Sequence, residues 1–436
     1  MRVLLVEPLG HWGGHFTAHT KHLAQALVNA GVDVTLLTFD GLLGKSTELD
    51  AEVKHISFLS QTGVLKPLLR CLPHLFPSKS IQEQLDHIFS TICTFFLALR
   101  RSRMGKYEVV HVLDAYEPDY AFPLFASITG NCSLVFTLYG ASIKTRLENW
   151  GARFRESLSK RQIMMGFQLW RLRLLGTRPA TTLREFLYRR GAERNRLAFI
   201  CYTSAVHDSY SGSSFHNRIM RMLHGAELPE AQPLTKGEAR EHLGLSQNRI
   251  MLLHFGANHP LKNFKVIFEA LRDLQSDYKL VFAGKVNLVN QANIPWKLAQ
   301  KYGLQQNTIT VDRYLTDEEA RYYFYAADAV ILSHRNEFKG ASGVLSTAAQ
   351  YNLPVIAADV GEIGNMVKNY KLGLTFEAEN PESLRESILS FLDINEEEKR
   401  KIKRNLSCFA QTHSWQEVAQ RHIELYQKLL QNSAVS

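Results

Sequence analysis

Residues 329–357 decide the fold, and they read AVILSHRNEFKGASGVLSTAAQYNLPVIA. Residues 329–332 and 354–357 are short apolar runs, which are typical of buried strands in a parallel sheet. Between them a glycine-containing turn precedes residues 344–351, where we expect a helix. A strand, a helix and a second strand in this order form a βαβ unit, and its crossover implies that the two strands are parallel.

The same alternation runs through the whole second half of the chain. Apolar runs predict strands over residues 250–256, 279–283 and 308–311. Helices are expected over residues 264–274 and 317–326, and further helices occupy the stretch from 381 to 430. Strands that alternate with helices in this way predict a doubly wound parallel sheet with helices on both faces.

The first half repeats this pattern with longer interruptions. A strand at residues 3–6 is followed by a glycine-containing loop at 10–14, a helix at 16–30 and a strand at 32–37. Further strands are expected at 109–113 and 134–138, residues 197–203 are expected to close the sheet, and residues 50–103 predict loops with one apolar helix near 88–99. The fold class is therefore α/β, with two Rossmann-like doubly wound domains that we expect to face a central cleft.

The length of 436 residues is enough for two hydrophobic cores. We place the first domain at residues 1–228, a linker rich in proline, glutamate and glutamine at 229–238, and the second domain at 239–412. The last segment, 413–436, is expected to be a helix that packs back toward the first domain. No run of about 18 apolar residues occurs, so we expect no membrane-spanning helix.

The cysteines indicate a reducing compartment. They number five, and no two of them form a Cys-x-x-Cys pair. Neither a disulfide framework nor a structural zinc site is therefore supported. We expect a cytoplasmic protein.

Most of the positive charge lies in one segment, residues 144–196. It contains 14 Lys and Arg against four Glu, a net charge of +10 in a chain whose net charge is +9. Large apolar residues are interleaved with the basic ones, as a helix on an anionic membrane surface requires. An ordinary basic, solvated face over a core is the open alternative. We expect no nucleic acid partner.

Several short motifs occur in the order found in one enzyme family. They are Gly13-Gly14-His15, Leu223-His224-Gly225, His254-Phe255-Gly256 followed by Lys262-Asn263, Leu280-Val281-Phe282-Ala283-Gly284, the strand 326–333, the segment 344–374 and Ser414-Trp415. Through these motifs the chain resembles glycosyltransferase family 4, whose members have the GT-B fold. The resemblance covers nearly the whole length of the chain.

The resemblance implies transfer of a sugar from a nucleotide-diphosphate donor to an acceptor hydroxyl, with retention of configuration and without a divalent metal. The first domain would bind a carbohydrate or lipid-linked acceptor, and the second domain the donor. Amides at residues 340–344, at the start of a predicted helix, suit a pyrophosphate, and Lys262 adds a positive charge. No Asp-x-Asp tripeptide occurs in the chain.

The resemblance also assigns candidate site residues. Catalytic roles are predicted for Lys262, His111 and Glu337. The predicted donor-binding residues are Gly13, Gly14, Gly256, Asn258, Lys262, Gly340, Ala341, Ser342, Gly343, Val344 and Thr347. No metal ligand and no cofactor other than the donor substrate is predicted.

The sequence departs from the family pattern around the donor loop. Thr347 stands where the second of two glutamates is common, and Glu337 lies two residues before the place of the first. Ala257 replaces an arginine, and Tyr139 replaces a histidine. Two alternatives to transfer therefore stay open: a catalytically inactive GT-B sugar-binding or scaffold protein, and a GT-B sugar-nucleotide epimerase. The donor sugar, its base and the acceptor also stay open.

Overall fold

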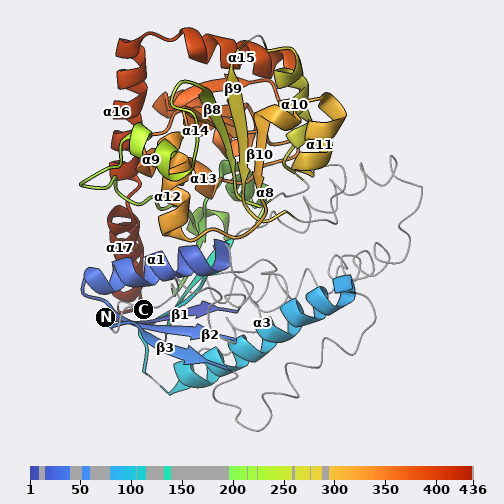
Figure 1. Cartoon of the computed structure of the whole chain (residues 1–436). Coiled ribbons are helices and arrows are strands. Elements are labelled where there is room, and N and C mark those ends of the chain that lie inside the picture. Colours follow the sequence, from blue (N-terminus) through green and yellow to red (C-terminus); the bar gives the residue numbers. More distant parts are fainter. Residues whose placement is uncertain are drawn as a thin grey trace. The chain divides into compact units, whose positions relative to one another are not determined.

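The computed structural model divides the chain into two compact units (Figure 1). It describes residues 1–8, 15–39, 52–58, 79–104, 106–113, 132–138, 196–213, 215–222, 224–257, 261–274, 276–286 and 294–434. The first unit comprises Met1–Leu223 together with Val418–Ser436, and the second comprises His224–Glu417. The chain therefore passes from one unit to the other twice, whereas the sequence had suggested boundaries at residues 228 and 412.

The first unit is built on a seven-stranded parallel sheet with the order β3-β2-β1-β4-β5-β6-β7. Its strands are β1 Arg2–Glu7, β2 Asp33–Thr38, β3 Lys54–Ser57, β4 Val109–Val112, β5 Ser133–Leu138, β6 Leu197–Cys201 and β7 Ile219–Arg221. The prediction that residues 197–203 close the sheet is wrong, because β7 pairs beyond β6. The edge strand β3 was predicted as loop. Both missed strands are short edge strands, whose few residues carry little periodic signal.

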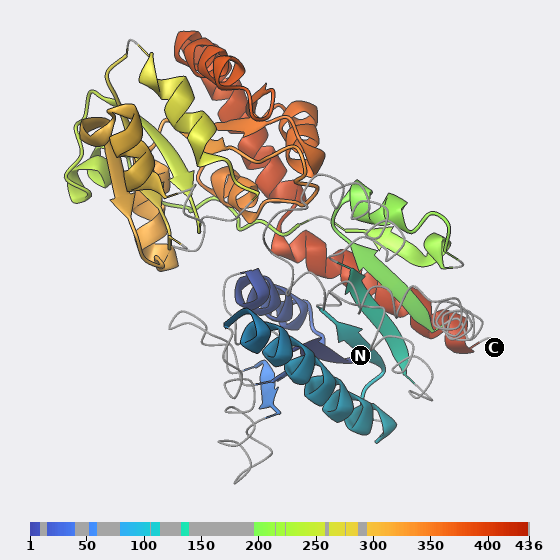
Figure 2. The same cartoon turned by 90° about the vertical axis from the view of Figure 1, so that its right-hand side faces the viewer.

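The helices of the first unit pack on both faces of this sheet. They are α1 His15–Asn29, α3 Lys79–Arg103, α8 Ser204–Ser209 and α17 Trp415–Ala434, and a 3₁₀ turn spans His216–Arg218. Leu4, Val6 and Val110 point to the face that packs against Phe95 and Ala98 of α3. The intervening residues of the strands point to the other face of the sheet. Figure 2 shows α17, in red, running beside the strands. Helix α3 is longer than the predicted 88–99.

The second unit is a six-stranded parallel sheet with the order β10-β9-β8-β11-β12-β13. Its strands are β8 Ile250–Phe255, β9 Tyr278–Ala283, β10 Thr308–Val311, β11 Ala329–Leu332, β12 Val355–Ala358 and β13 Gly373–Phe376. Numbered along the chain this is 3-2-1-4-5-6, the order of the Rossmann fold, so the strand order reverses between β8 and β11. The predicted α/β doubly wound architecture is confirmed in both units, and it is that of GT-B proteins.

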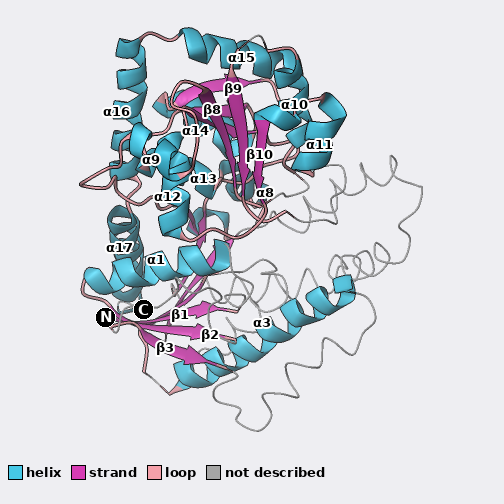
Figure 3. Ribbon diagram, in the orientation of Figure 1, coloured by secondary structure: helices cyan, strands magenta, loops and turns pink. Residues whose placement is uncertain are grey.

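Helices cover both faces of this second sheet (Figure 3). One apolar core joins the sheet to α9, α12, α13, α14 and α16, and another joins it to α10, α11 and α15. Their bounds are α9 Lys236–His242, α10 Phe264–Arg272, α11 Pro295–Tyr302, α12 Asp317–Ala326, α13 Gly343–Gln350, α14 Gly361–Tyr370, α15 Pro381–Asp393 and α16 Glu396–Thr412, with a 3₁₀ turn at Gln305–Asn307. Helix α9 begins inside the predicted linker 229–238, because Thr235 and Glu238 form a capping box there.

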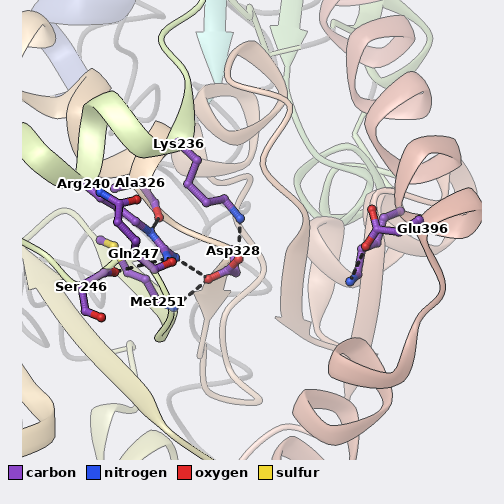
Figure 4. Close-up of polar contacts among 9 residues, drawn as sticks. Lys236, Arg240, Ser246, Gln247, Met251, Ala326, Asp328 and Glu396 are labelled. Atoms are coloured by element: carbon purple, nitrogen blue, oxygen red, sulfur yellow. Dashed lines mark hydrogen bonds and ion pairs between the residues drawn. The ribbon is translucent and has the colours of Figure 1, made fainter.

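A polar network around the buried Arg240 guanidinium fastens α9 to the sheet (Figure 4). The Asp328 carboxylate accepts hydrogen bonds from Lys236 Nζ at 2.5 Å, Arg240 Nη2 at 2.8 Å and the Met251 amide at 2.8 Å. The buried Arg240 guanidinium also donates to the carbonyl oxygens of Ala326 and Gln247. These bonds hold α9 beside the start of β8 and the start of β11.

In the described part of the chain, no helix has the length and apolarity that crossing a membrane requires.

Candidate functional site

The loops after β8 and β11 meet where the strand order of the second unit reverses, which is where open α/β sheets bind their ligands. Lys262, on the loop after β8, forms an antiparallel bridge with His334, which follows β11. The Asn263 amide donates to Ser333 O at 2.6 Å, and the Arg335 amide donates to Leu261 O at 2.8 Å. The lysine backbone is therefore fixed to the end of β11.

The Lys262 ammonium is held above the end of β8. Its Nζ donates to Phe255 O at 3.2 Å and to Ala257 O at 3.0 Å. Gly256 has a φ of +88°, and a Cβ built on it would lie 3.4 Å from Lys262 Nζ and 3.9 Å from Val344 Cγ2. The structure thus brings together Gly256, Lys262 and Val344, three of the predicted donor-binding residues. Burial lowers the pKa of Lys262 to about 8, because desolvation disfavours the charged form.

Helix α13 presents its N-terminus at this place without a side-chain cap. Its N-cap residue is Ser342, whose side chain makes no capping hydrogen bond, and the Leu345 amide donates to Ser342 O at 3.0 Å. Within the described residues, the amides of Gly343 and Val344 donate to no protein acceptor. Such amides, aligned with the helix dipole, attract an anion.

Two other predicted residues lie near α13 with different contacts. The Thr347 hydroxyl donates to Gly343 O at 3.1 Å, so its proton is used inside the helix. Glu337 is exposed in the turn between β11 and α13, and it forms no hydrogen bond or ion pair with the described residues. Its neighbours Arg335 and Asn336 both bind Glu379, at 2.8 and 3.1 Å. These two contacts fix the start of the turn that carries Glu337.

The turn before α13 packs tightly through Gly340. A Cβ on Gly340 would lie 2.9 Å from Phe338 Cζ. The Phe338 ring in turn lies 4.2 Å from the His334 ring, centroid to centroid. This packing positions the stretch that continues through Ala341 and Ser342 to the helix.

His111, predicted to be catalytic, lies in the core of the first unit. It is fully buried in β4, with Nδ1 2.7 Å from Tyr426 Oη and Nε2 2.8 Å from Thr137 Oγ1. Burial, and then the nearby His422, hold the pKa of His111 well below its usual range. Both ring nitrogens are therefore used within the unit, and the neutral imidazole ties α17 to β4 and β5.

The predicted residues Gly13, Gly14 and Asn258 lie outside the described residues, and so does nearly all of the basic segment 144–196. His254, the first residue of the motif His254-Phe255-Gly256, packs in the core next to this site. It is buried against Phe264 and Phe282, at ring distances of 4.4 and 5.3 Å, directly below the lysine loop. Burial, then Lys262, lower the pKa of His254 well below its usual range, so the neutral ring adds no competing charge.

Comparison with known proteins agrees with this geometry. Residues 235–406 match the model of the family described as glycosyl transferases group 1. This matched range lies within the second unit and covers most of it. The matched range contains Lys262, Gly256 and all of α13, so the converging residues all lie in the part of the chain that resembles this family.

Individual relatives are distant. The chain is 28% identical over 180 residues to an uncharacterized glycosyltransferase of Methanocaldococcus jannaschii, covering 41% of this chain and 48% of that protein. It is 25% identical over 235 residues to a D-inositol 3-phosphate glycosyltransferase of Rhodococcus erythropolis, covering 52% of each. The chain thus spans about half the length of the curated relatives it matches.

Solved structures resemble the whole chain. HepE of Anabaena, crystallised with UDP and glucose, is similar with a TM-score of 0.66 and 15% identity over 97% of this chain and 98% of that one. At this identity the likeness shows the fold, and it extends to the first unit, which lies outside the range matched by the family model.

Proposed function

We propose that the protein is a glycosyltransferase that moves a sugar from a nucleotide-diphosphate donor to an acceptor hydroxyl. The observation that carries the proposal is the convergence of the Lys262 ammonium, the backbone at Gly256 and the uncapped start of α13, all within the range that matches the group 1 family model. Both curated relatives are named as glycosyltransferases, and HepE was crystallised with UDP and glucose, which supports the same reaction class.

The proposed chemistry uses positive charge where the leaving group gains negative charge. As the bond from the sugar to the diphosphate breaks, charge develops on the phosphate oxygens. The Lys262 ammonium and the amides of Gly343 and Val344 would stabilise that charge, and we propose that no divalent metal is needed. The departing phosphate oxygen would accept the proton of the acceptor hydroxyl on the same face of the sugar, which retains the configuration.

Two further residues receive roles in this proposal. Thr347, one turn into α13, would accept a hydrogen bond from the donor ribose in place of a carboxylate. Glu337, exposed in the turn before α13, would hold a sugar hydroxyl. Carbohydrate and lipid-linked molecules are the proposed acceptor classes, and peripheral membrane contact through residues 144–196 stays a proposal.

Calorimetric titration with UDP, GDP and ADP in the presence of EDTA tests the donor site. We expect saturable binding of one nucleoside diphosphate, and about 10- to 150-fold weaker binding by Lys262→Ala, because a charge-assisted hydrogen bond contributes about 1.5–3 kcal/mol. Lys265→Ala is the matched control, since Lys265 is exposed on α10 and pairs with Glu269. Failure of all three nucleotides to bind contradicts the proposal.

A second function is favoured by Thr347 alone. Because it replaces a carboxylate with a hydroxyl that already donates to Gly343 O, the chain could bind sugar nucleotides without transferring the sugar. Thr347→Glu would then raise donor affinity without producing transfer, whereas a transferase would show turnover in the unmodified protein.

A further inference from the structure

The two chain crossings are tied together at the edge of the second unit. Residue Ala226, just after the first crossing, forms a parallel bridge with Ser414, just before the second. The Ala226 amide donates to His413 O at 2.8 Å, and the Trp415 amide donates to Ala226 O at 3.2 Å. The segment that enters the unit is therefore held to the segment that leaves it.

A tryptophan ring lies flat against the entering segment. A Cβ built on Gly225 would lie only 2.4–2.5 Å from three ring carbons of Trp415, so no larger residue fits there without displacement. The His224 ring lies 6.4 Å from the Trp415 ring, centroid to centroid. His224 Nδ1 lies 3.2 Å from Gly225 O, a contact in which the nitrogen acts as the donor.

The His224 imidazole also reaches the start of α13. A Cβ built on Gly343 would lie 3.8 Å from His224 Cε1, the ring carbon between the two nitrogens. Gly343 is the first residue of the uncapped helix and carries one of the two amides that donate to no acceptor in the described chain. A group bound at these amides therefore meets the edge of the His224 ring.

We propose that His224 is a further ligand of the donor diphosphate. Through His224, the occupied donor site is coupled to the backbone bridge between Ala226 and Ser414, which joins the two segments where the chain crosses between units. This inference rests on the proposed nucleotide-diphosphate donor. Nδ1 donates to Gly225 O, and a diphosphate beside the ring favours the imidazolium, whose Nε2 then donates to a phosphate oxygen. Occupancy of the site adds a contact to His224 and so stabilises the backbone bridge between Ala226 and Ser414 against opening.

The placement also explains why the two glycines occur where they do. Gly343 has no side chain to separate the imidazole from the helix amides, and Gly225 lets the Trp415 ring press against the backbone that carries His224. The imidazole is therefore positioned from two sides, by Trp415 and by Gly225 O. A positioned donor loses less entropy on binding than a mobile side chain does.

Calorimetry with a nucleoside diphosphate and with the matching nucleoside tests this ligand role. His224→Phe keeps an aromatic ring beside Trp415 but removes both nitrogens, and we expect diphosphate binding at least tenfold weaker with nucleoside binding unchanged. His224→Gln returns an N–H near the place of Nε2, and we expect it to recover part of the lost affinity. Thermal unfolding of both variants is expected to match the unmodified protein.

Three results separate the explanations. If the unmodified protein binds the diphosphate and Lys262→Ala weakens it, but both His224 variants bind normally, the His224 inference is wrong while the proposed function stands. If both variants lose diphosphate and nucleoside binding equally, His224 has a packing role and the inference is again wrong. Absence of binding by the unmodified protein removes the proposed function and the inference that rests on it.

Hydrogen exchange provides a second, independent readout. In the unmodified protein, we expect saturating nucleoside diphosphate to slow exchange of the Ala226 and Trp415 amides, which hold the two crossings together. In His224→Phe at saturating ligand this protection is expected to vanish. Equal protection in the variant would overturn the link between the donor site and the crossings.

Discussion

The ionisation of Lys262 makes the donor affinity depend on pH. Its Nζ is held by the carbonyl oxygens of Phe255 and Ala257, and burial lowers its pKa to about 8. Only the ammonium attracts a diphosphate, so protonation and binding are linked. Raising the pH through 8 removes the charge from the unliganded site, and the dissociation constant must rise.

The magnitude follows from the fraction of charged lysine. With a pKa of about 8, about nine-tenths of the unliganded protein carries the ammonium at pH 7, and about one-tenth carries it at pH 9. A diphosphate that binds the charged form therefore loses about tenfold in affinity between these two values. The loss fits within the 10- to 150-fold that a charge-assisted hydrogen bond of about 1.5–3 kcal/mol contributes.

Calorimetric titration at pH 7, 8 and 9 measures this dependence, and Lys262→Arg is the matched control. The guanidinium stays charged throughout this range, so, when both proteins also carry His224→Phe to remove the imidazole, the dissociation constant of the arginine variant is expected to change less than about threefold. The difference between the two profiles removes any titration of the nucleotide itself. Identical profiles for lysine and arginine would refute the reasoning.

Three further predictions concern the framework that supports the site. Arg240→Ala should lower the free energy of unfolding by about 3 kcal/mol, because the buried Ala326 carbonyl and the partly buried Asp328 carboxylate lose their donor. The exposed Arg249→Ala should cost less than about 1 kcal/mol in the same urea titration. Gly225→Ala should cost about 1–3 kcal/mol through overlap with the adjacent indole, and Gly212→Ala, with open space around it, should cost less than about 0.5 kcal/mol. Burial lowers the pKa of His422 in the folded protein to about 4, so as the pH falls below 6.5 the unfolded chain binds a proton at this residue before the folded chain does. The contribution of His422 should therefore lower the free energy of unfolding by up to about 1.4 kcal/mol per pH unit between pH 6.5 and 4. His422→Leu should make that fall shallower in urea titrations at successive pH values, and an unchanged slope would contradict the assignment.

The fold was predictable wherever the hydrophobic period was unbroken. Strands such as β10 and helices such as α12 were placed to the residue, because apolar runs and a Thr-x-x-Glu capping box mark them locally. The edge strands β3 and β7 were missed, since a short edge strand buries few side chains and carries little pattern. The residue at which α17 passes from the second unit to the first could not be predicted either, because it depends on long-range packing that no local pattern encodes.

The site was predictable in part for the same reason. Lys262 and the start of α13 follow directly from strand, glycine and helix signals in the sequence. His111 had the expected position at the end of a strand, but the direction of its side chain depends on Tyr426, more than 300 residues later in the chain. His224 lies in the motif Leu223-His224-Gly225, but its contact with α13 could not be predicted, because residues 224 and 343 are brought together only by the fold.

A donor-consumption assay tests the central claim most directly. The protein is incubated in EDTA with the sugar conjugate of whichever nucleoside diphosphate it binds, together with a panel of carbohydrate and lipid-linked acceptors. Release of nucleoside diphosphate that matches newly glycosylated acceptor by mass spectrometry, and that falls at least tenfold in Lys262→Ala, is the result the account predicts. Tight binding of the sugar nucleotide with no release under any acceptor, or conversion of its sugar without transfer, would contradict it.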